Sequence, residues 1–377
     1  MTAPALALTG IRVLDVTELL PGPYATQMLC DMGAEVIKIE RPGSGDGYRA
    51  MRASAFAAIN RGKKSVTLNL KCEAGRDALL RLARDADVLI EGYRPGVMDR
   101  LGLGYKAARA VNSGIIYASV SGFGQNGPMR DFPGHDLTYN AVAGVLSLCG
   151  RSDRPEYAVG IPVADLSGGL FTVTSILAAL MLRGRTGEGQ YLDIALADTT
   201  LAMVGPRLNS TKKSILCRAG NDVYETSDGR YIAVAALEDQ FWKRLVSVLG
   251  VPELADARYA NMRERWQATD RLAPLICAAL RKRTHDEWLR TFAEHDVPAT
   301  SVSELDTLAE HPQIAARGMM LEGEGGPYLG YPVPMQGVDA AANHAPCAIG
   351  AHTEAVLTAA GYTAAEIAAM SNAGVAS

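Results

Sequence analysis

A chain of 377 residues is long enough for about two domains, and its composition of 48% hydrophobic and 21% charged residues is typical of globular proteins. This balance excludes fibrous and intrinsically disordered chains. The formal net charge of −4 provides no overall positive field toward nucleic acid, and aromatic residues, at 6%, are too few to favour base-stacking surfaces. Composition therefore argues against nucleic acid as a partner.

The six cysteines are spread along the chain without a Cys-x-x-Cys pair, which argues against a zinc knuckle or a disulfide framework. We therefore expect a reduced, cytoplasmic location. The first ten residues carry no basic stretch ahead of their apolar run, so no secretory signal is predicted. The longest uncharged apolar run, 168–182, is shorter than the ~20 residues that a membrane span needs. It predicts a buried helix and no membrane association.

The N-terminal part alternates short β-branched runs with helical stretches, the pattern of a parallel sheet covered by helices. Strands are predicted at 12–16, 35–39, 65–70, 88–91 and 115–119, helices at 23–32 and 75–84, and a strand-to-helix passage at 191–204. Such a doubly wound α/β core binds ligands beyond the carboxyl ends of its strands. The predicted site therefore lies in the loops after Glu40, Leu70, Glu91 and Ser119.

In the second half of the chain, the alternation of short strands and helices gives way to a different pattern. A hairpin is predicted around Asp228-Gly229, followed by amphipathic helices. The expected domains are a large α/β domain formed by 1–205 and 322–377, a linker at 206–222, and a smaller α+β domain at 223–321.

The segment Gly122–Gly127 has the G-x-G-x-x-G spacing of dinucleotide-binding loops and follows a predicted strand. That loop normally opens a helix and is followed about 20 residues later by an acidic residue, whereas here Pro128 follows at once. We interpret the segment as a flexible glycine loop beside a pocket. The motifs of serine hydrolases, P-loop proteins and zinc proteases do not occur, and no metal site is predicted.

Basic side chains recur near the carboxyl ends of the predicted strands or in the loops beyond them. They are Lys38, Arg41, Arg61, Lys71, Arg94 and Arg100. A run of charges is usually a solvated surface, yet cations gathered on one rim suit a polyphosphate because they form charge-assisted hydrogen bonds with its oxygens. The pattern favours a phosphate-bearing ligand.

Two further side chains stand at predicted helix starts. His135 lies in a Pro-Gly-His-Asp turn, and Asp165 opens the apolar helix after Pro162. An N-terminal carboxylate commonly caps its helix for about 1 kcal/mol, and a lone histidine is more often structural than catalytic. The backbone N–H groups at a helix start also stabilise nearby anions, which makes both residues candidates for a site. The other five histidines are interpreted as surface or structural residues.

Several longer segments resemble the family III CoA-transferases, and within that superfamily the chain is most similar to the α-methylacyl-CoA racemases. The similarity is carried by 33–42, 60–64, 87–96, 100–104, 122–128 and 185–190. The racemase form is matched by Gly134-His135-Asp136, Glu91-Gly92-Tyr93 and 236–241, whereas 160–169 is closer to the transferases. The resemblance implies an interlocked homodimer that acts on an acyl-CoA thioester and needs no prosthetic group, coenzyme A being part of the substrate.

The resemblance also implies roles for individual residues. His135 and Asp165 are then the two bases that invert the α-carbon of a 2-methylacyl-CoA through an enolate. Glu238 orients the histidine across subunits, and the backbone N–H of Asp136 stabilises the enolate oxygen. The residues implied to contact coenzyme A are Lys38, Arg41, Leu68, Asn69, Leu70, Lys71, Gly92, Tyr93, Arg94, Arg100, Gly134 and Tyr139.

Two alternatives use the same residues differently. In a CoA-transferase, the Asp165 carboxylate attacks the acyl-CoA and then carries coenzyme A as a covalent thioester to a second acid, with His135 a bystander. A coenzyme A-binding regulatory protein requires a degraded carboxylate site, and the presence of Asp165 argues against it. The sequence does not define the acyl group.

Overall fold

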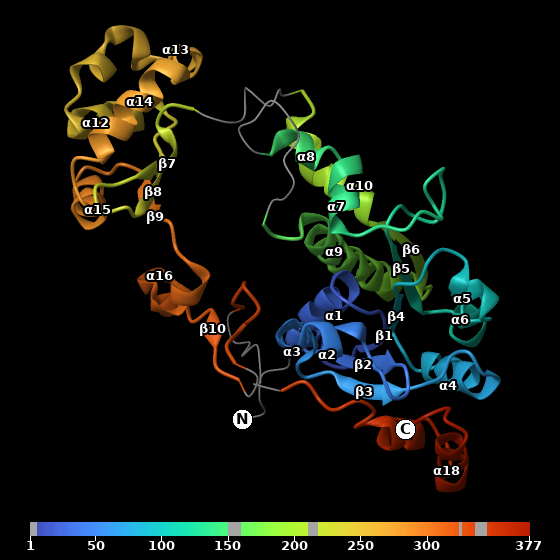
Figure 1. Ribbon diagram of the computed structural model, residues 1–377. Coiled ribbons are helices and arrows are strands. Elements are labelled where there is room, and N and C mark those ends of the chain that lie inside the picture. Colours follow the sequence, from blue (N-terminus) through green and yellow to red (C-terminus); the bar gives the residue numbers. More distant parts are fainter. Residues whose placement is uncertain (1–5, 150–159, 210–217, 324–325, 336–344) are drawn as a thin grey trace. The chain divides into compact units, whose positions relative to one another are not determined.

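The computed structural model describes residues 6–149, 160–209, 218–323, 326–335 and 345–377 (Figure 1). The chain divides into two compact units. The first comprises Met1–Leu146, Tyr157–Leu208 and Ala315–Ser377, and the second comprises Ser147–Glu156 and Asn209–Ile314. Much of the predicted linker, 210–217, lies outside the described residues.

The first unit contains a six-stranded parallel sheet with the order β3-β2-β1-β4-β5-β6. Its strands are β1 (Arg12–Val16), β2 (Glu35–Glu40), β3 (Lys64–Thr67), β4 (Val88–Glu91), β5 (Ile116–Ser121) and β6 (Gln190–Ala195). The chain order reverses between β1 and β4, where Val13 lies beside Val88. Ligands of doubly wound sheets bind outside the carboxyl ends of the strands at such a reversal. The predicted α/β fold is confirmed.

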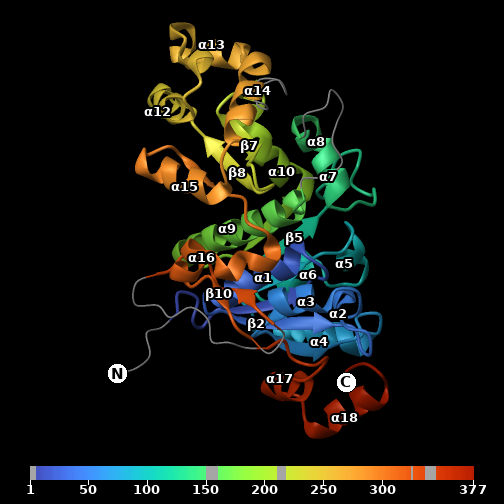
Figure 2. The same cartoon turned by 60° about the vertical axis from the view of Figure 1, so that its left-hand side comes forward.

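Helices cover both faces of this sheet (Figures 1 and 2). One layer holds α1 (Pro21–Asp31) and α9 (Val163–Thr186), and the other holds α4 (Glu73–Ala83), α6 (Tyr105–Val111), α17 (Thr353–Ala359) and α18 (Ala364–Asn372). Val13 packs in the core beneath α1 and α9, whereas Leu14 packs in the core beneath α4. Successive residues of a strand point to opposite faces, so a strand buried on both faces is a continuous apolar run.

The remaining elements of the first unit are short. They include α2 (Gly47–Met51), α3 (Ala53–Asn60), α5 (Val97–Arg100), α7 (Asp136–Val142), α10 (Leu196–Val204), the 3₁₀ turn Gly205–Arg207, β10 (Met320–Leu321) and β11 (Tyr328–Leu329). Two short helices, α8 (Val145–Leu148) and α16 (Pro312–Arg317), each cross a boundary between the units. The predicted strand-to-helix passage at 191–204 corresponds to β6 and α10. The predicted strand 65–70 ends at Thr67, because Asn69 folds back and its side chain accepts a hydrogen bond from the N–H of Lys71.

Among the described helices, α9 alone is long and apolar enough to cross a membrane by length and composition. Val173, Ile176 and Ala179 pack it against the sheet as a core helix. Other apolar side chains of the same helix, including Phe171 and Met181, are exposed. The prediction of a buried helix is therefore right for one face only.

The second unit is a small α+β structure. Its antiparallel sheet consists of β7 (Asn221–Glu225), β8 (Tyr231–Ala235) and β9 (Ala299–Ser301), and its helices are α12 (Asp239–Leu249), α13 (Met262–Gln267), α14 (Thr269–Leu280) and α15 (His285–Glu294), with 3₁₀ turns at Pro252–Ala255, Ala257–Ala260 and Leu305–Glu310. The predicted hairpin turns at Gly229, whose φ of 76° suits glycine. Trp242, Trp288 and Phe292 form the centre of its separate core.

A network of buried charges lies under the carboxyl end of β1. Asp15 is fully buried, and its carboxylate accepts hydrogen bonds from the hydroxyls of Thr17 and Thr26. The ammonium of Lys63 lies 3.2 Å from the same carboxylate, and that of Lys38 lies 3.9 Å away. Burial, the largest single effect, opposes ionisation, but the two lysines and the two threonine hydroxyls together outweigh it and hold the pKa of Asp15 well below its ordinary value.

Lys38 extends the same network from β2. Its ammonium lies 2.9 Å from Asp46 and donates a hydrogen bond of 2.9 Å to the backbone oxygen of Thr17. Buried charges are tolerated only when they are paired and hydrogen-bonded in this way. The network therefore fixes the start of the loop after β1.

We predict that Asp15→Asn lowers the free energy of unfolding by about 3–5 kcal/mol, because it leaves two buried lysines without their shared carboxylate. Lys64→Met provides the control, since Lys64 pairs with Glu35 at the surface and its loss is expected to cost less than about 1 kcal/mol. Urea denaturation followed by circular dichroism measures both. Equal losses would contradict a structural role of the buried network.

Candidate active site

A cavity of about 430 Å³ opens at the carboxyl edge of the sheet, where the chain order reverses. Its described lining comes mainly from the loops after β1, β4 and β5 and from the first turn of α9. It includes Thr17, Glu18, Leu19, Tyr48, Gly92, Tyr93, Arg94, Ser121, Arg130, Phe132, Gly134, His135, Tyr139 and Asp165. The predicted loop after Glu91 thus contributes to the cavity, whereas the loop after Leu70 provides none of the described lining residues.

Asp165 is the third residue of α9 and has an unusual environment for that position. The side-chain oxygen Oδ1 of Asp136 accepts hydrogen bonds from the N–H of Ala164, at 2.7 Å, and from the N–H of Asp165, at 3.3 Å. These donors at the helix start are therefore taken by a different carboxylate. Among the described residues, no hydrogen-bond donor reaches the carboxylate of Asp165.

Burial and the neighbouring charge of Asp136, in that order, raise the pKa of Asp165 to about 7. The field of Asp165 also contributes to the raised pKa values of Tyr48 and Tyr139, behind the larger effect of their own burial. Both tyrosines line the same cavity. A partly buried carboxylate in a cavity, without bonds that stabilise its charge, is a candidate nucleophile or base.

Asp136 acts through its side chain. It is the first residue of α7, and its second carboxylate oxygen accepts a 2.7 Å hydrogen bond from the Asn140 amide. The carboxylate therefore joins the start of α7 to the start of α9. The predicted role of its backbone N–H, as donor to a substrate oxygen, stays a prediction.

His135 and Asp165 line the same cavity, as the resemblance implied. The histidine precedes α7, and its backbone is fixed because its N–H donates to the hydroxyl of Thr138 at 3.1 Å while its carbonyl accepts from the same residue. Its imidazole is exposed. Glu238 lies in the second unit, exposed at the start of α12, and its contact with His135 stays a prediction.

The ring of Tyr139 forms a wall of the cavity and explains two glycines beside it, Gly122 and Gly134. A Cβ atom on Gly122 or on Gly134 would lie 2.5 Å from this ring, which no structure tolerates without movement. Phe123 packs on the ring edge to face, with centroids 5.2 Å apart. The segment that begins at Gly122 therefore makes room for an aromatic side chain beside Asp165, and no helix opens at its end.

The other residues implied to contact coenzyme A fall into two groups. Gly92, Tyr93, Arg94, Gly134 and Tyr139 line the cavity, whereas Lys38, Arg41, Leu68, Asn69, Leu70, Lys71 and Arg100 do not. Leu68 and Leu70 are core residues, and Arg41 pairs with Glu18 at 2.8 Å. Lys71 and Arg100 are exposed.

The expected gathering of six cations on one rim is wrong for at least two of them. Lys38 is buried, and its ammonium is occupied by Asp46 and Thr17. Arg61 is also buried, where it pairs with Asp31 at 2.7 Å and stacks over Tyr328. Lys38 lies within β2 and Arg61 precedes β3, and the sequence does not show that a distant carboxylate neutralises either of them.

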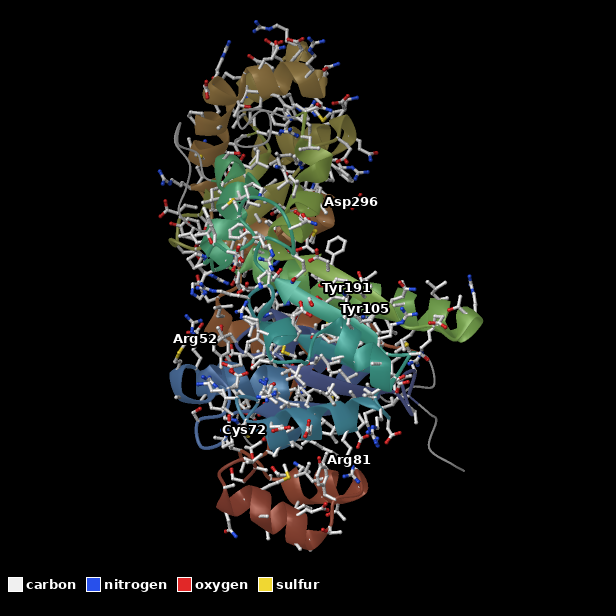
Figure 3. The ribbon with its side chains drawn as sticks, turned by 90° about the vertical axis from the view of Figure 1, so that its right-hand side faces the viewer. Arg52, Cys72, Arg81, Tyr105, Tyr191 and Asp296 are labelled. Carbon is white, nitrogen blue, oxygen red and sulfur yellow. The ribbon has the colours of Figure 1, made fainter. Side chains whose placement is uncertain are left out.

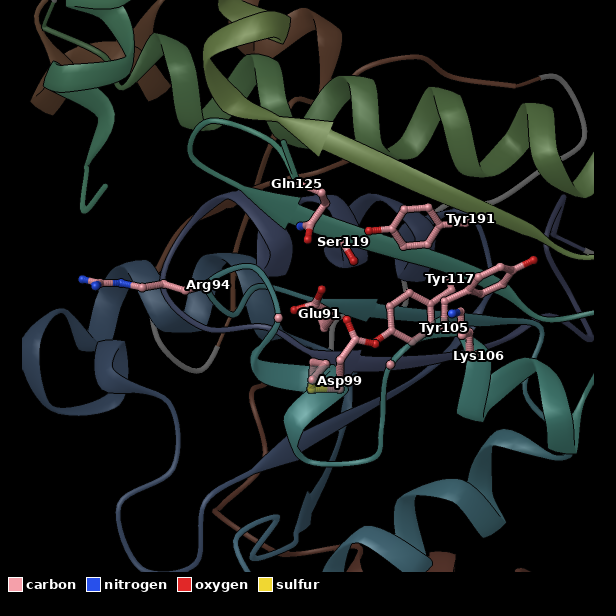
Figure 4. Close-up of a pocket in the computed structure, with 12 residues that line it drawn as sticks. Glu91, Arg94, Asp99, Tyr105, Lys106, Tyr117, Ser119, Gln125 and Tyr191 are labelled. Atoms are coloured by element: carbon pink, nitrogen blue, oxygen red, sulfur yellow. The ribbon is translucent and has the colours of Figure 1, made fainter. Parts of the chain in front are cut away.

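A second, smaller cavity of about 190 Å³ lies next to the first and shares Arg94 with it. Figure 4 shows Glu91 and Asp99 near its centre and Arg94 extending away from them. Tyr105 and Tyr191, which are neighbours in Figure 3, form part of its wall with their rings 5.3 Å apart.

Glu91 lines the smaller cavity and is hydrogen-bonded to a residue that lines the larger one. Its carboxylate accepts a 2.8 Å hydrogen bond from the backbone N–H of Tyr93, which lines the larger cavity, and burial raises the pKa of Glu91 to about 7. The resemblance matched Glu91 only as part of a motif. In the structure its side chain supports the loop that forms one wall of the site.

Sequence reasoning missed Arg130, Tyr48 and the side chain of Asp136. Arg130 had a usable signal, because it lies in the loop beyond β5 and meets the criterion applied to the other cations. Tyr48 lies in α2 and had none. Asp136 accepts the α9 amides because the start of α7 lies beside the start of α9 in the fold. Asp136 and Ala164 are 28 residues apart in the chain, so this contact had no sequence signal.

The sequence matches the model of CoA-transferase family III over residues 8–353. The chain belongs to this family. It is 38% identical over 349 residues to an acetyl-CoA:oxalate CoA-transferase of Acetobacter aceti, covering 88% of this chain and 89% of the relative. It is 35% identical over 341 residues to a succinate–glutarate CoA-transferase of Agrobacterium fabrum, covering 84% of each chain.

A solved structure agrees with this assignment. The crystal structure of a CaiB/BaiF family protein from Brucella suis matches with a TM-score of 0.83 and 32% identity, covering 94% of this chain and 100% of that one. The resemblance to the superfamily is thus confirmed. The names of the two relatives are those of transferases, which favours the transferase alternative over the racemase prediction.

We predict that Asp165→Asn increases stability relative to the native chain as the pH rises from about 4 to about 7, with no further change above. The folded state holds the pKa of Asp165 at about 7, above its ordinary value of 3.8, so ionisation in the folded state costs stability across this window. Urea unfolding at several pH values measures the difference. In an Asp136→Asn background the upper limit of the window is expected to move to lower pH, and a pH-independent difference would contradict the assignment.

Proposed function

We propose that this enzyme moves coenzyme A from an acyl-CoA to a carboxylic acid, with Asp165 as the nucleophile. The observation that carries the proposal is the Asp165 carboxylate itself, which faces a cavity at the sheet reversal without a hydrogen-bond donor among the described residues. A carboxylate held in this state is a better nucleophile than a solvated one. Family membership and the names of the relatives support the same reaction.

The proposed reaction begins when a carboxylate oxygen of Asp165 attacks the thioester carbonyl. The carbon–sulfur bond breaks and gives a mixed anhydride and the coenzyme A thiolate. The thiolate then attacks the Asp165 carbonyl, which releases the donor acid and leaves an aspartyl-CoA thioester. An acceptor carboxylate attacks this thioester, which gives a second mixed anhydride and releases the thiolate. The thiolate then attacks the acceptor carbonyl of that anhydride, which forms the new acyl-CoA and regenerates the Asp165 carboxylate. No proton and no electron is lost or gained overall.

The racemase prediction rested on three segments, one of which contains His135, and His135 does line the cavity with Asp165. The names of the relatives do not support it, and 2-methylacyl-CoA racemisation is not the function that we propose. In the transferase scheme neither the imidazole of His135 nor Glu238 carries a chemical step. His135 then serves as a wall of the acyl site.

We propose a short dicarboxylic acid as one of the exchanged acids. The relatives named above are transferases of oxalate and of succinate and glutarate, all of which carry two carboxylates. Arg94 supplies a cation in the same cavity, where its charge opposes the rise in the pKa of Tyr139. A guanidinium in the same cavity as the nucleophile suits the second carboxylate of such an acid.

We also propose that Gly92, Tyr93 and Gly134 contact coenzyme A and that the protein is cytoplasmic.

We further propose that the protein is a homodimer, which the exposed apolar side chains of α9 and α10 support. These are Leu170, Phe171, Met181, Leu182, Leu201 and Met203. An apolar surface of this kind on a folded protein commonly marks a protein interface.

We predict that Asp165→Asn reduces coenzyme A transfer from acetyl-CoA to oxalate, succinate or glutarate by roughly 10³-fold or more, because an amide does not act as the nucleophile. His135→Ala is the matched control in the same cavity and is expected to retain transfer within about tenfold. Hydroxylamine added during turnover should inactivate the native enzyme by trapping the aspartyl thioester.

The same assay in D₂O, with a 2-methylacyl-CoA and no acceptor acid, tests the racemase. Deuterium at C2 that depends on His135, without transfer to any acid, would reverse the choice between the two reactions.

We predict that the protein in solution has twice the 40.0 kDa mass of one chain, measured by light scattering after gel filtration. The double substitution Phe171→Asp and Met203→Asp should shift the mass to that of one chain, whereas Arg258→Asp, on an exposed side chain of the second unit, should not. A monomeric native protein would contradict the proposal.

A further inference from the structure

Two arginines converge on one point beside Gly96. A Cβ atom built on this glycine would lie 3.3 Å from Nη1 of Arg100 and 3.3 Å from Nη2 of Arg130. Because both nitrogens are that close to a single point, they are at most twice this distance from each other. Arg100 is on α5 and Arg130 is in the loop beyond β5, so the fold brings them together from separate elements.

This approach of two positive charges is not balanced by a carboxylate between them. Among the described residues, Arg100 has no carboxylate oxygen within 4.0 Å. Arg130 is held from its other side, where Nε donates to the Gln125 carbonyl at 2.9 Å and Nη1 lies 3.0 Å from Asp131. Its Nη2 is directed toward Gly96 instead. Two guanidinium groups that face the same space form a site for an anion.

Gly96 keeps this space open. Its φ of 77° is in the left-handed region, which favours glycine, and a side chain there would stand between the two guanidinium groups. Charge-assisted hydrogen bonds from arginine to phosphate are about 2.8 Å long, so nitrogens up to roughly 6–7 Å apart are able to bind the oxygens of one phosphate group.

We propose that Arg100 and Arg130 together bind a phosphate group of coenzyme A across Gly96. This inference rests on the proposed function, because it takes coenzyme A as the bound ligand. The resemblance implied a coenzyme A contact for Arg100 alone, whereas the structure assigns Arg130 as its partner and Gly96 as the gap between them.

The position of this arginine pair favours a phosphate over the carboxylate of the acceptor acid. Arg130 is in the wall of the cavity that contains Asp165, but Gly96 lines only the neighbouring cavity, and Arg100 lines neither. The pair therefore lies at the boundary between the two cavities, and only Arg130 reaches the wall of the one that contains Asp165. A phosphate on the long coenzyme A chain extends that far, whereas a short acid bound to Asp165 does not.

The proposal is tested by calorimetric binding of coenzyme A, dephospho-coenzyme A and pantetheine to the native chain and to variants. Arg130→Ala is expected to weaken coenzyme A binding by roughly 10- to 100-fold, since hydrogen bonds to charged groups are the strong ones, and to leave pantetheine binding unchanged. Arg100→Ala should have a similar effect, and the double variant should lose less than the product of the two. Arg130→Lys should restore binding only in part.

Arg109→Ala is the matched control, because Arg109 is an exposed arginine that pairs with Glu188 instead. If Arg130→Ala weakens dephospho-coenzyme A as much as coenzyme A, the bound group is the diphosphate; if it affects only coenzyme A, the group is the 3′-phosphate. Either result supports the pair.

Equal weakening of coenzyme A and pantetheine by Arg130→Ala would overturn the proposal, as would a higher KM for the acceptor acid with unchanged coenzyme A binding. Because binding is measured without turnover, it separates this inference from the proposed reaction. Arginine-dependent binding without any transfer would contradict the reaction alone, and failure of the native chain to bind coenzyme A would contradict the pair.

Discussion

The shared carboxylate of Asp15 under the end of β1 is the interaction on which the site depends most. Two lysines and two threonines from separate segments meet on it in the interior. Charges buried in this way have no alternative partners, so they fix the segments that carry them. Thr17, which also lines the cavity, is held by Asp15 and by Lys38 at the same time. The wall of the cavity that contains Asp165 is therefore anchored by buried charges that are not among its described lining residues.

A related constraint acts at the start of α9. The amides at a helix start usually stabilise a nearby anion, and Asp165 is placed where they would stabilise its own carboxylate. Asp136 accepts them instead, so that Asp165 is left with burial and a neighbouring negative charge. The Asp136 carboxylate thus accepts the amides at the start of α9, and the Asp165 carboxylate is left without them. A simple helix cap, which was the plain interpretation of Asp165, is the role that Asp136 performs.

The roles of the glycines and arginines at the site depend on their neighbours in the fold and not on their spacing in the sequence. The loop at Gly122–Gly127 looked like a dinucleotide-binding motif, but its first glycine leaves room for the ring of Tyr139. The cations also looked alike in sequence, although Arg61 closes an ion pair inside the fold and Arg100 approaches Arg130 over a glycine. The distinction depends on which acidic residue lies opposite each one. Only three-dimensional neighbours decide that.

The sequence alone determined the parallel sheet, because a strand buried on both faces must be continuously apolar, and it predicted three of the helices that cover the sheet, α1, α4 and α9. It identified the superfamily, and it singled out His135 and Asp165, which line one cavity in the structure. It also predicted where the site would form, since ligands bind at the carboxyl ends of such strands. Only the tertiary structure decided the state of each charged group. Whether Lys38 is available to a ligand, whether Asp165 keeps the amides of its own helix, and whether Arg130 faces Arg100 all depend on contacts between distant segments. The electrostatic energy of a charged group depends on its burial and on its distance from other charges, and the order of residues in the sequence specifies neither.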